Sequence, residues 1–163
     1  MNKIDLTEKL KEELMKRNLF EQDDEDEDDD ESDNKEEESS NSNEDFCEMV
    51  CQLLHSQTQV HIFHLGTKSY SEHKALQGYY EGIDALVDGI IESYQGKYGL
   101  LTNYKSFKNQ SYKNKNQVLK YFTSLLNTIE EKRDCCDDSY IQNQIDTVQE
   151  LIYSTMYKLK FLQ

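Results

Sequence analysis

The chain contains no proline and only six glycines among 163 residues, so few positions can interrupt a helix. From residue 44 onward its apolar residues recur every three or four positions, the spacing that lines one face of an α-helix. We predict helices over residues 44–65, 70–95, 114–134 and 138–161, the first two ending at Gly66 and Gly96. The pattern is typical of an all-α antiparallel four-helix bundle with a longer crossover between its second and third helices.

The third and fourth predicted helices carry the clearest core positions. They are Val118, Tyr121, Phe122, Leu125, Leu126 and Ile129, followed by Ile141, Ile145, Val148, Ile152, Met156 and Leu159.

The net charge of −15 is concentrated in one segment of the chain. Residues 21–45 hold sixteen acidic residues and one lysine, a local balance of −15, so the remainder is close to neutral. Within it, residues 21–43 are almost without apolar side chains and should form a disordered acidic linker. Before it, residues 1–20 have the pattern of a short amphipathic helix. The bundle then occupies residues 44–163.

Three interpretations of the acidic linker remain open. It can serve as a solubilising spacer, or attract cations such as Fe(II) toward the bundle by long-range forces that weaken with salt. It can also tether residues 1–20 as a docking segment for a partner, since a short amphipathic helix is a common recognition element. No sequence feature identifies that partner.

Neither a membrane span nor a secretory segment is expected. No run of eighteen or more apolar residues is present, so we expect no helix that crosses a membrane. Residues 1–20 have mixed charges and no continuous apolar run, which favours an intracellular, cytoplasmic protein. A composition rich in Asn, Lys and Tyr indicates an AT-rich genome, and a viral or phage origin is compatible with it.

The four cysteines form two pairs that do not match a zinc motif. Cys47 and Cys51 stand four residues apart, and Cys135 and Cys136 are adjacent, so neither pair has C-x-x-C spacing. In an intracellular protein we expect reduced thiols that are buried or idle.

The stretch "VHIFHLGTKSYSEHKALQGYYEGIDALVDGIIE", residues 60–92, holds three of the four histidines. At about 100° per residue, six polar residues of the second predicted helix fall on a stripe about a quarter-turn wide. They are His73, Gln77, Glu81, Asp84, Asp88 and Glu92. On the first helix, His61 continues the stripe of Val50, Leu54 and Gln57, and an imidazole on an apolar face must be paired or ligated.

This polar stripe has two interpretations. It can be the solvated face of the second helix, as charge runs usually are. Apolar residues flank it on both sides, however, with Leu76 and Ile83 on one flank and Tyr80 and Val87 on the other. That arrangement favours a helix that lies at an interface.

The same stretch resembles the Dps-like mini-ferritins of the ferritin-like superfamily. The family has a histidine, a second histidine twelve residues later, an Asp four residues further, and an Asp-x-x-x-Glu pair eleven residues after that Asp. Here His61 and His73 are twelve residues apart, and Asp88 and Glu92 follow His73 by fifteen and nineteen. The helix pattern extends the resemblance over residues 44–163.

Two positions depart from the family pattern. Gln77 replaces the first Asp, and Ile62 replaces the Trp that commonly follows the first histidine. An amide oxygen is a poorer ligand than a carboxylate, so metal binding should weaken. From spacing alone, Glu81 is a candidate to compensate, and Asp84 is a candidate to accept a hydrogen bond from a ligating histidine.

The remaining two histidines are weaker candidates for metal ligands. We interpret His64 as an interface or surface residue, with metal binding as the alternative, because imidazole is the commonest metal-ligating side chain. His55 is interpreted as structural or exposed.

The resemblance implies a protein that oxidises Fe(II) with oxygen or peroxide, stores or detoxifies iron, and protects against oxidative damage. It implies a homo-oligomer, a dimer at least, with a closed dodecameric shell as the further expectation. Iron would be held by His61 and His73 of one subunit and by Asp88 and Glu92 of its two-fold partner, with no catalytic residue separate from these ligands. The rival interpretation is a degenerate bundle that acts as a scaffold or interaction module.

The long connection before the third helix is basic and aromatic. No acidic residue occurs between Ser93 and Thr128, and tyrosines interleave with lysines, which are the elements of a single-strand nucleic-acid surface. The candidate contacts are Lys105, Lys108, Lys113 and Lys115. We favour a solvated connection instead and do not expect DNA binding, because the acidic N-terminal region would repel phosphate.

Overall fold

The computed structural model describes residues 32–162, with side chains from residue 42 onward. The chain divides into two compact units, residues 1–35 and 36–163, and the second unit contains the core of the protein. The amphipathic helix predicted for residues 1–20 and the part of the linker predicted for 21–31 lie outside the described residues.

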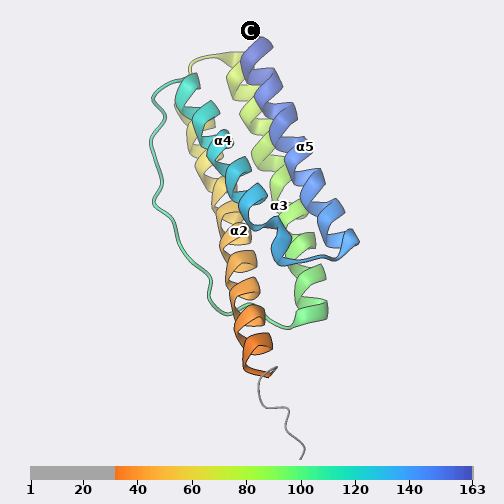
Figure 1. Ribbon diagram of the computed structural model, residues 1–163. Coiled ribbons are helices and arrows are strands. Elements are labelled where there is room, and N and C mark those ends of the chain that lie inside the picture. The colour runs from red at the N-terminus through yellow and green to blue at the C-terminus, as the bar shows by residue number, and fades with distance from the viewer. Residues whose placement is uncertain (1–31, 163) are drawn as a thin grey trace, which may run out of the picture. The chain divides into compact units, whose positions relative to one another are not determined.

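The described residues form an all-helical bundle of four α-helices without strands (Figure 1). The helices are α2 (Ser32–Gly66), α3 (Tyr70–Tyr98), α4 (Lys115–Lys132) and α5 (Ser139–Phe161), with a short 3-10 turn, η1 (Arg133–Cys135), before α5. None of these helices is long and apolar enough to cross a membrane.

The direction of each helix follows from the lengths of the connections. A three-residue turn reverses the chain between α2 and α3, whereas residues 99–114, the crossover, run back along the bundle before α4 begins (Figure 1). As a result α3 and α4 point the same way, and α5 returns in the opposite direction (Figure 1).

The predicted helices are close to the observed ones, with two differences at their ends. α2 begins at Ser32 and not at residue 44, so residues 32–43 are helical where we predicted disordered linker. Glu and Lys are good helix formers, and no Gly or Pro interrupts this segment. α3 continues past Gly96 to Tyr98 and is capped by Gly99, whose φ of 95° only glycine adopts readily. The Gly99 N–H donates to the Gln95 carbonyl.

The core is apolar and contains the predicted positions. Every core residue predicted for α4 and α5 is buried except Tyr121, which is half-buried. One polar pair lies among them: the Tyr79 hydroxyl is 2.7 Å from Ser56 Oγ, and Ser56 Oγ also donates to the Leu53 carbonyl at 2.6 Å. Burial raises the pKa of Tyr79, so this pair stays neutral and hydrogen-bonded.

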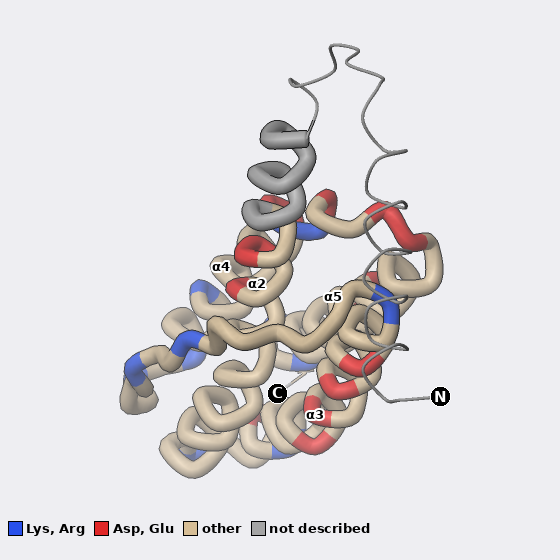
Figure 2. The backbone as a smooth tube through the Cα atoms, turned by 90° about the horizontal axis from the view of Figure 1, so that it is seen from below, with Lys and Arg blue, Asp and Glu red and all other residues tan. Residues whose placement is uncertain are grey.

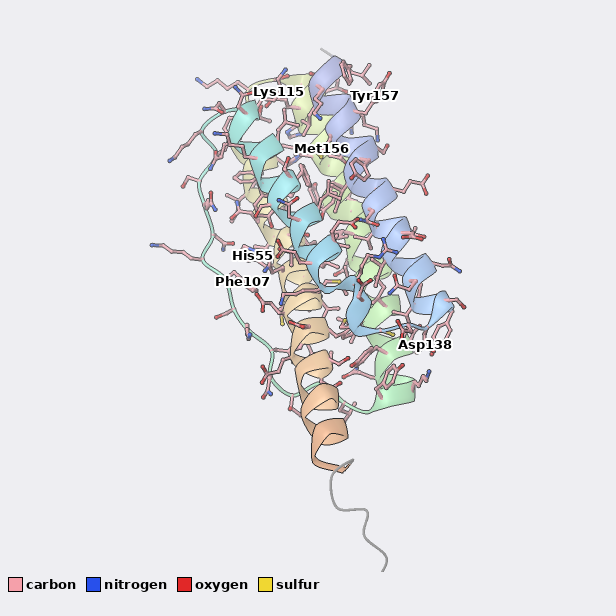
Figure 3. The ribbon with its side chains drawn as sticks, in the orientation of Figure 1. His55, Phe107, Lys115, Asp138, Met156 and Tyr157 are labelled. Carbon is pink, nitrogen blue, oxygen red and sulfur yellow. The ribbon has the colours of Figure 1, made fainter. Side chains whose placement is uncertain are left out.

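The crossover is attached to α2 by hydrogen bonds. The fully buried Gln59 side chain donates to the Gln110 carbonyl at 2.8 Å and accepts from the Gln110 N–H at 2.7 Å. The Lys105 N–H donates to Cys51 Sγ at 3.2 Å. His55 lies beside Phe107, their ring centroids 5.6 Å apart (Figure 3). The crossover therefore lies on α2 over most of its length.

Glycines set the closest approaches in the bundle. Gly82 and Gly89 face α5, where an added Cβ would lie 3.5 Å from Leu151 and 3.7 Å from Gln144. At the end of α2, a Cβ on Gly66 would lie 2.4 Å from the Tyr112 Cβ, which no side chain tolerates without movement. Gly66 is thus required where the crossover passes over the α2–α3 turn.

Asp138 connects the other end of α3 to the start of α5. Its two carboxylate oxygens accept from Lys97 Nζ at 2.5 Å and from the Tyr98 hydroxyl at 2.6 Å. These hydrogen bonds hold the pKa of Asp138 below its usual value. Asp138 lies at the end of the bundle opposite to Lys115 and Tyr157 (Figure 3).

Alanine substitutions at two glycines should change stability in opposite directions. Gly66→Ala forces its Cβ against Tyr112 and should lower the free energy of unfolding by about 1–3 kcal/mol. Gly96→Ala, with no atom within 4 Å of the added Cβ, should raise it by about 0.5–1 kcal/mol. Urea denaturation followed by circular dichroism measures both. Equal effects of the two substitutions would contradict the Tyr112 contact.

Candidate metal site

The polar stripe of α3 lies on a face that the rest of the chain leaves open. Glu81, Asp84, Asp88 and Glu92 are exposed, whereas His73 and Gln77 are half-buried. Figure 2 shows the acidic positions along α3. The apolar residues predicted to border the stripe do pack on the core: Leu76, Ile83 and Val87 are buried, and Tyr80 is half-buried. In a single chain the stripe is accordingly a solvent face bordered by core residues.

His61 is exposed near the end of α2 and not on an apolar face as we predicted. Only the first residue of the stripe that it continues is in the core: Val50 is buried, whereas Leu54 is 38% exposed and Gln57 is half-buried. The imidazole still has a partner, because its ring stacks on Tyr80 of α3 with centroids 4.2 Å apart.

His64 and His73 hold the α2–α3 turn together through a reciprocal pair of contacts. His64 Nδ1 lies 2.9 Å from the His73 carbonyl oxygen, and His73 Nδ1 lies 3.2 Å from the His64 carbonyl oxygen. The two rings are stacked with centroids 3.6 Å apart. Because a carbonyl can only accept, each Nδ1 must carry the hydrogen, and in a neutral imidazole this leaves Nε2 with the free lone pair.

The interpretation of His64 as a surface or interface residue is therefore wrong, because its side chain is only 6% exposed. Sequence reasoning missed its role because the signal lies in the turn. Two histidines nine residues apart are brought face to face only when the chain reverses over three residues between them.

Together His61, His64 and His73 form a histidine cluster at the α2–α3 end of the bundle. The His61 and His64 ring centroids are 5.7 Å apart. The rings of His64 and His73 lie face to face. No group of three or more His, Cys, Asp or Glu side chains within the described residues is placed to hold a metal ion.

One chain does not bring the four predicted ligands together. Asp88 and Glu92 follow His73 by fifteen and nineteen residues on the same helix, which corresponds to about 22 and 28 Å along its axis. The histidines thus lie toward one end of α3 and the carboxylates toward the other. Asp84, about 16 Å along the axis from His73, is likewise too far to accept from His73 of its own chain.

Gln77 is engaged in contacts within α3. Its Oε1 accepts from Lys74 Nζ at 2.5 Å, and its Nε2 donates to Glu81 Oε1 at 2.7 Å. Glu81, the residue considered as a compensating ligand, is therefore hydrogen-bonded to the amide that replaces the family's aspartate.

The candidate nucleic-acid lysines are arranged as a surface connection. Lys105 pairs with Glu48 at 3.8 Å, Lys108 and Lys113 are exposed, and Lys115 begins α4. Aromatic residues of the crossover pack on the bundle: Phe107 contacts His55, and the Tyr112 hydroxyl donates to Glu72 at 2.7 Å. His55, predicted to be structural or exposed, is half-buried and lies 2.9 Å from Asn109 Oδ1.

A protein-family model described as "Family of unknown function (DUF5856)" matches residues 64–159. The chain belongs to this family. The match begins at His64 and includes α3, the crossover, α4 and most of α5. His73, Asp88 and Glu92 of α3 therefore lie inside it, and His61 lies outside it. No curated protein and no solved structure matches the chain.

Substitutions of His64 should separate its ring stacking from its hydrogen bond. His64→Phe keeps a ring against His73 but cannot donate to the carbonyl, so the free energy of unfolding should fall by about 1 kcal/mol. His64→Ala also leaves a cavity and should lower it by about 2–4 kcal/mol. Urea denaturation gives both values. A phenylalanine variant as stable as the wild type would show that the hydrogen bond contributes nothing.

Proposed function

We propose that this chain binds Fe(II) and promotes its oxidation, as the Dps-like mini-ferritins do, at a site shared by two copies. The observation that carries the proposal is the register of His61, His73, Asp88 and Glu92 on neighbouring helices. All four lie on the outer side of the α2–α3 pair: His73 is half-buried and the other three are exposed. They are therefore accessible to a second copy.

Because His73 and the Asp88–Glu92 pair are far apart along α3, the α3 helix of the second copy must run antiparallel to the first. If two α3 helices cross near the midpoint between His73 and the Asp88–Glu92 pair, the histidine end of one meets the carboxylate end of the other. That midpoint falls near residue 82. Gly78 and Ala85 on either side of it are exposed and small, which favours a close approach of two helices there. A two-fold pair of this kind would form two identical sites.

The ligand chemistry suits Fe(II). Two imidazoles with carboxylates and open positions are typical of non-haem iron sites, and the carboxylates offset the added charge when the ion becomes Fe(III). The reciprocal contacts of His64 and His73 support the proposal, because they leave the Nε2 of His73 without a hydrogen and available as a ligand. With peroxide, two Fe(II) ions each lose one electron, and one H₂O₂ takes up both electrons and two protons to give two waters.

The course of the chain supports a ferritin-like arrangement. Ferritin-like bundles contain one long crossover, which makes their second and third helices parallel. Residues 99–114 serve as such a connection in this bundle (Figure 1). The proposal therefore includes a dimer as the smallest active unit and a larger closed shell as its natural extension.

A second candidate function is a bundle without oxidase activity that serves as a scaffold. Gln77 favours it, because its amide brings no charge and is already bonded to Lys74 and Glu81. The iron-oxidation experiment separates the two candidates.

Removal of one ligand from each half of the site should abolish iron oxidation. Anaerobic Fe(II) is added to the purified protein, oxygen or peroxide is admitted, and the ferric absorbance is followed. Wild type should exceed buffer, whereas His61→Ala with Asp88→Ala should fall to the buffer rate with unchanged helical content. His55→Ala with Glu150→Ala, on faces away from the stripe, is the matched control. Full activity in the first double variant would eliminate the assigned site.

A mixture of two inactive variants should recover activity if the site is shared. One chain carries His61→Ala and His73→Ala, and the other carries Asp88→Ala and Glu92→Ala; the two are co-expressed with different tags. A mixed dimer has one site with all four ligands and one with none, so the purified heterodimer should show about half the wild-type rate. Heterodimers as inactive as either parent would mean that the ligands do not meet across two chains.

A further inference from the structure

Cys47 and Cys51 form a pair of thiols on one face of α2, one helical turn apart. Their sulfur atoms are 3.9 Å apart, and each side chain is 3% exposed. All four cysteines of the chain are free, so this is a dithiol and not a disulfide. Two metal–thiolate bonds of about 2.3 Å each span up to about 4.6 Å, so one ion between the two sulfurs reaches both without any movement of the helix.

The crossover supplies groups that stabilise negative charge on these sulfurs. The Lys105 N–H donates to Cys51 Sγ at 3.2 Å. The Lys105 ammonium pairs with Glu48, next to Cys47, and its charge acts on the Cys47 thiol. A dithiolate with a bound monovalent cation carries one net negative charge, which the N–H and the ammonium of Lys105 would partly offset.

Cys47 of the pair borders a cavity. This cavity of about 220 Å³ lies between α2 and residues 98–103, and Asn43 and Glu44 line it together with Cys47. An ion can therefore approach the pair from the Cys47 side without unfolding of the helix.

We propose that Cys47 and Cys51 bind one thiophilic monovalent cation, of which Cu(I) is the biological example. Thiolates are soft ligands and select Cu(I), zinc or iron–sulfur clusters. Zinc sites need at least three protein ligands, and within the described residues no third His, Cys, Asp or Glu is placed to complete such a set. Cu(I), by contrast, is satisfied by two thiolates.

Binding exchanges two protons for one ion. Burial, together with the neighbouring Cys51, raises the pKa of Cys47 to about 11, so the Cys47 thiol is protonated at neutral pH. Each S–H bond breaks as a sulfur–copper bond forms, and both protons leave to the buffer; copper stays Cu(I) throughout. Cys135 and Cys136 provide no comparable pair, since the sulfur–sulfur contact occurs between Cys47 and Cys51.

The test is a competition for Cu(I) under anaerobic conditions. The full-length protein is titrated into the coloured complex of Cu(I) with bicinchoninate, and the loss of colour gives the copper bound. Wild type should remove one equivalent per chain. Cys47→Ser with Cys51→Ser should bind at least tenfold less, whereas Cys135→Ser with Cys136→Ser, the matched control, should bind as wild type does.

Three results would overturn the proposal: no competition by wild type, equal competition by the Cys47/Cys51 variant, or Zn(II) held as tightly as Cu(I). X-ray absorption on copper-loaded wild type decides the matter if the serine variant fails to fold. Two sulfur donors at copper are expected there. Nitrogen donors would assign the ion to the histidine cluster instead.

Discussion

The attachment of the crossover to α2 determines which faces of the bundle remain open. Residues 99–114 must travel the length of the bundle to start α4 beside the end of α2, and they do so on α2, fixed by Gln59, Cys51 and Gly66. The polar face of α3 is left uncovered as a consequence. A connection that crossed α3 instead would have buried Asp88 and Glu92, at a free-energy cost that unpaired carboxylates rarely allow.

The two ends of the α2–α3 pair carry different kinds of polar side chain. At the turn, histidines stack on each other and on Tyr80, and their Nδ1 atoms are committed to backbone carbonyls. Toward the far end, the exposed side of α3 carries carboxylates, while the adjoining side of α2 carries a dithiol under the crossover. The carboxylates and the dithiol thus lie on different helices at the same end of the pair, so the two cations that we propose would bind without competing for the same donors.

Much of this fold could be predicted from the sequence, because apolar spacing decides which side of each helix is buried. The core of α5 is an example: its predicted core positions, from Ile141 to Leu159, follow helical spacing without interruption and are all buried. The ends of the helices were harder to predict than their buried faces. Gly96 was predicted to end α3, but its backbone stays helical and the positive φ occurs at Gly99, so α3 continues to Tyr98. The start of α2 was missed because a highly charged composition predicts disorder even where Glu and Lys favour helix.

The candidate site was predictable only in part. The stripe of α3 follows from a rotation of 100° per residue, but its exposure in one chain does not, since a solvated face and an interface have the same pattern. His64 was assigned to the surface or an interface, which is wrong, because its partner lies across a turn that the helix pattern does not reveal. Contacts between segments distant in sequence, such as that of Gln59 with Gln110, leave no periodic signal.

That contact also constrains the order in which the chain can fold. Fifty-one residues separate Gln59 from Gln110, so the loop between them closes only after α3 has been made, and its closure carries an entropic cost that the α2–α3 hairpin does not. On a ribosome, α2 and α3 would emerge and pair first. During that interval the crossover would not yet cover Cys47 and Cys51, so under our proposal a newly made chain would load or lose a soft cation more readily than a finished one.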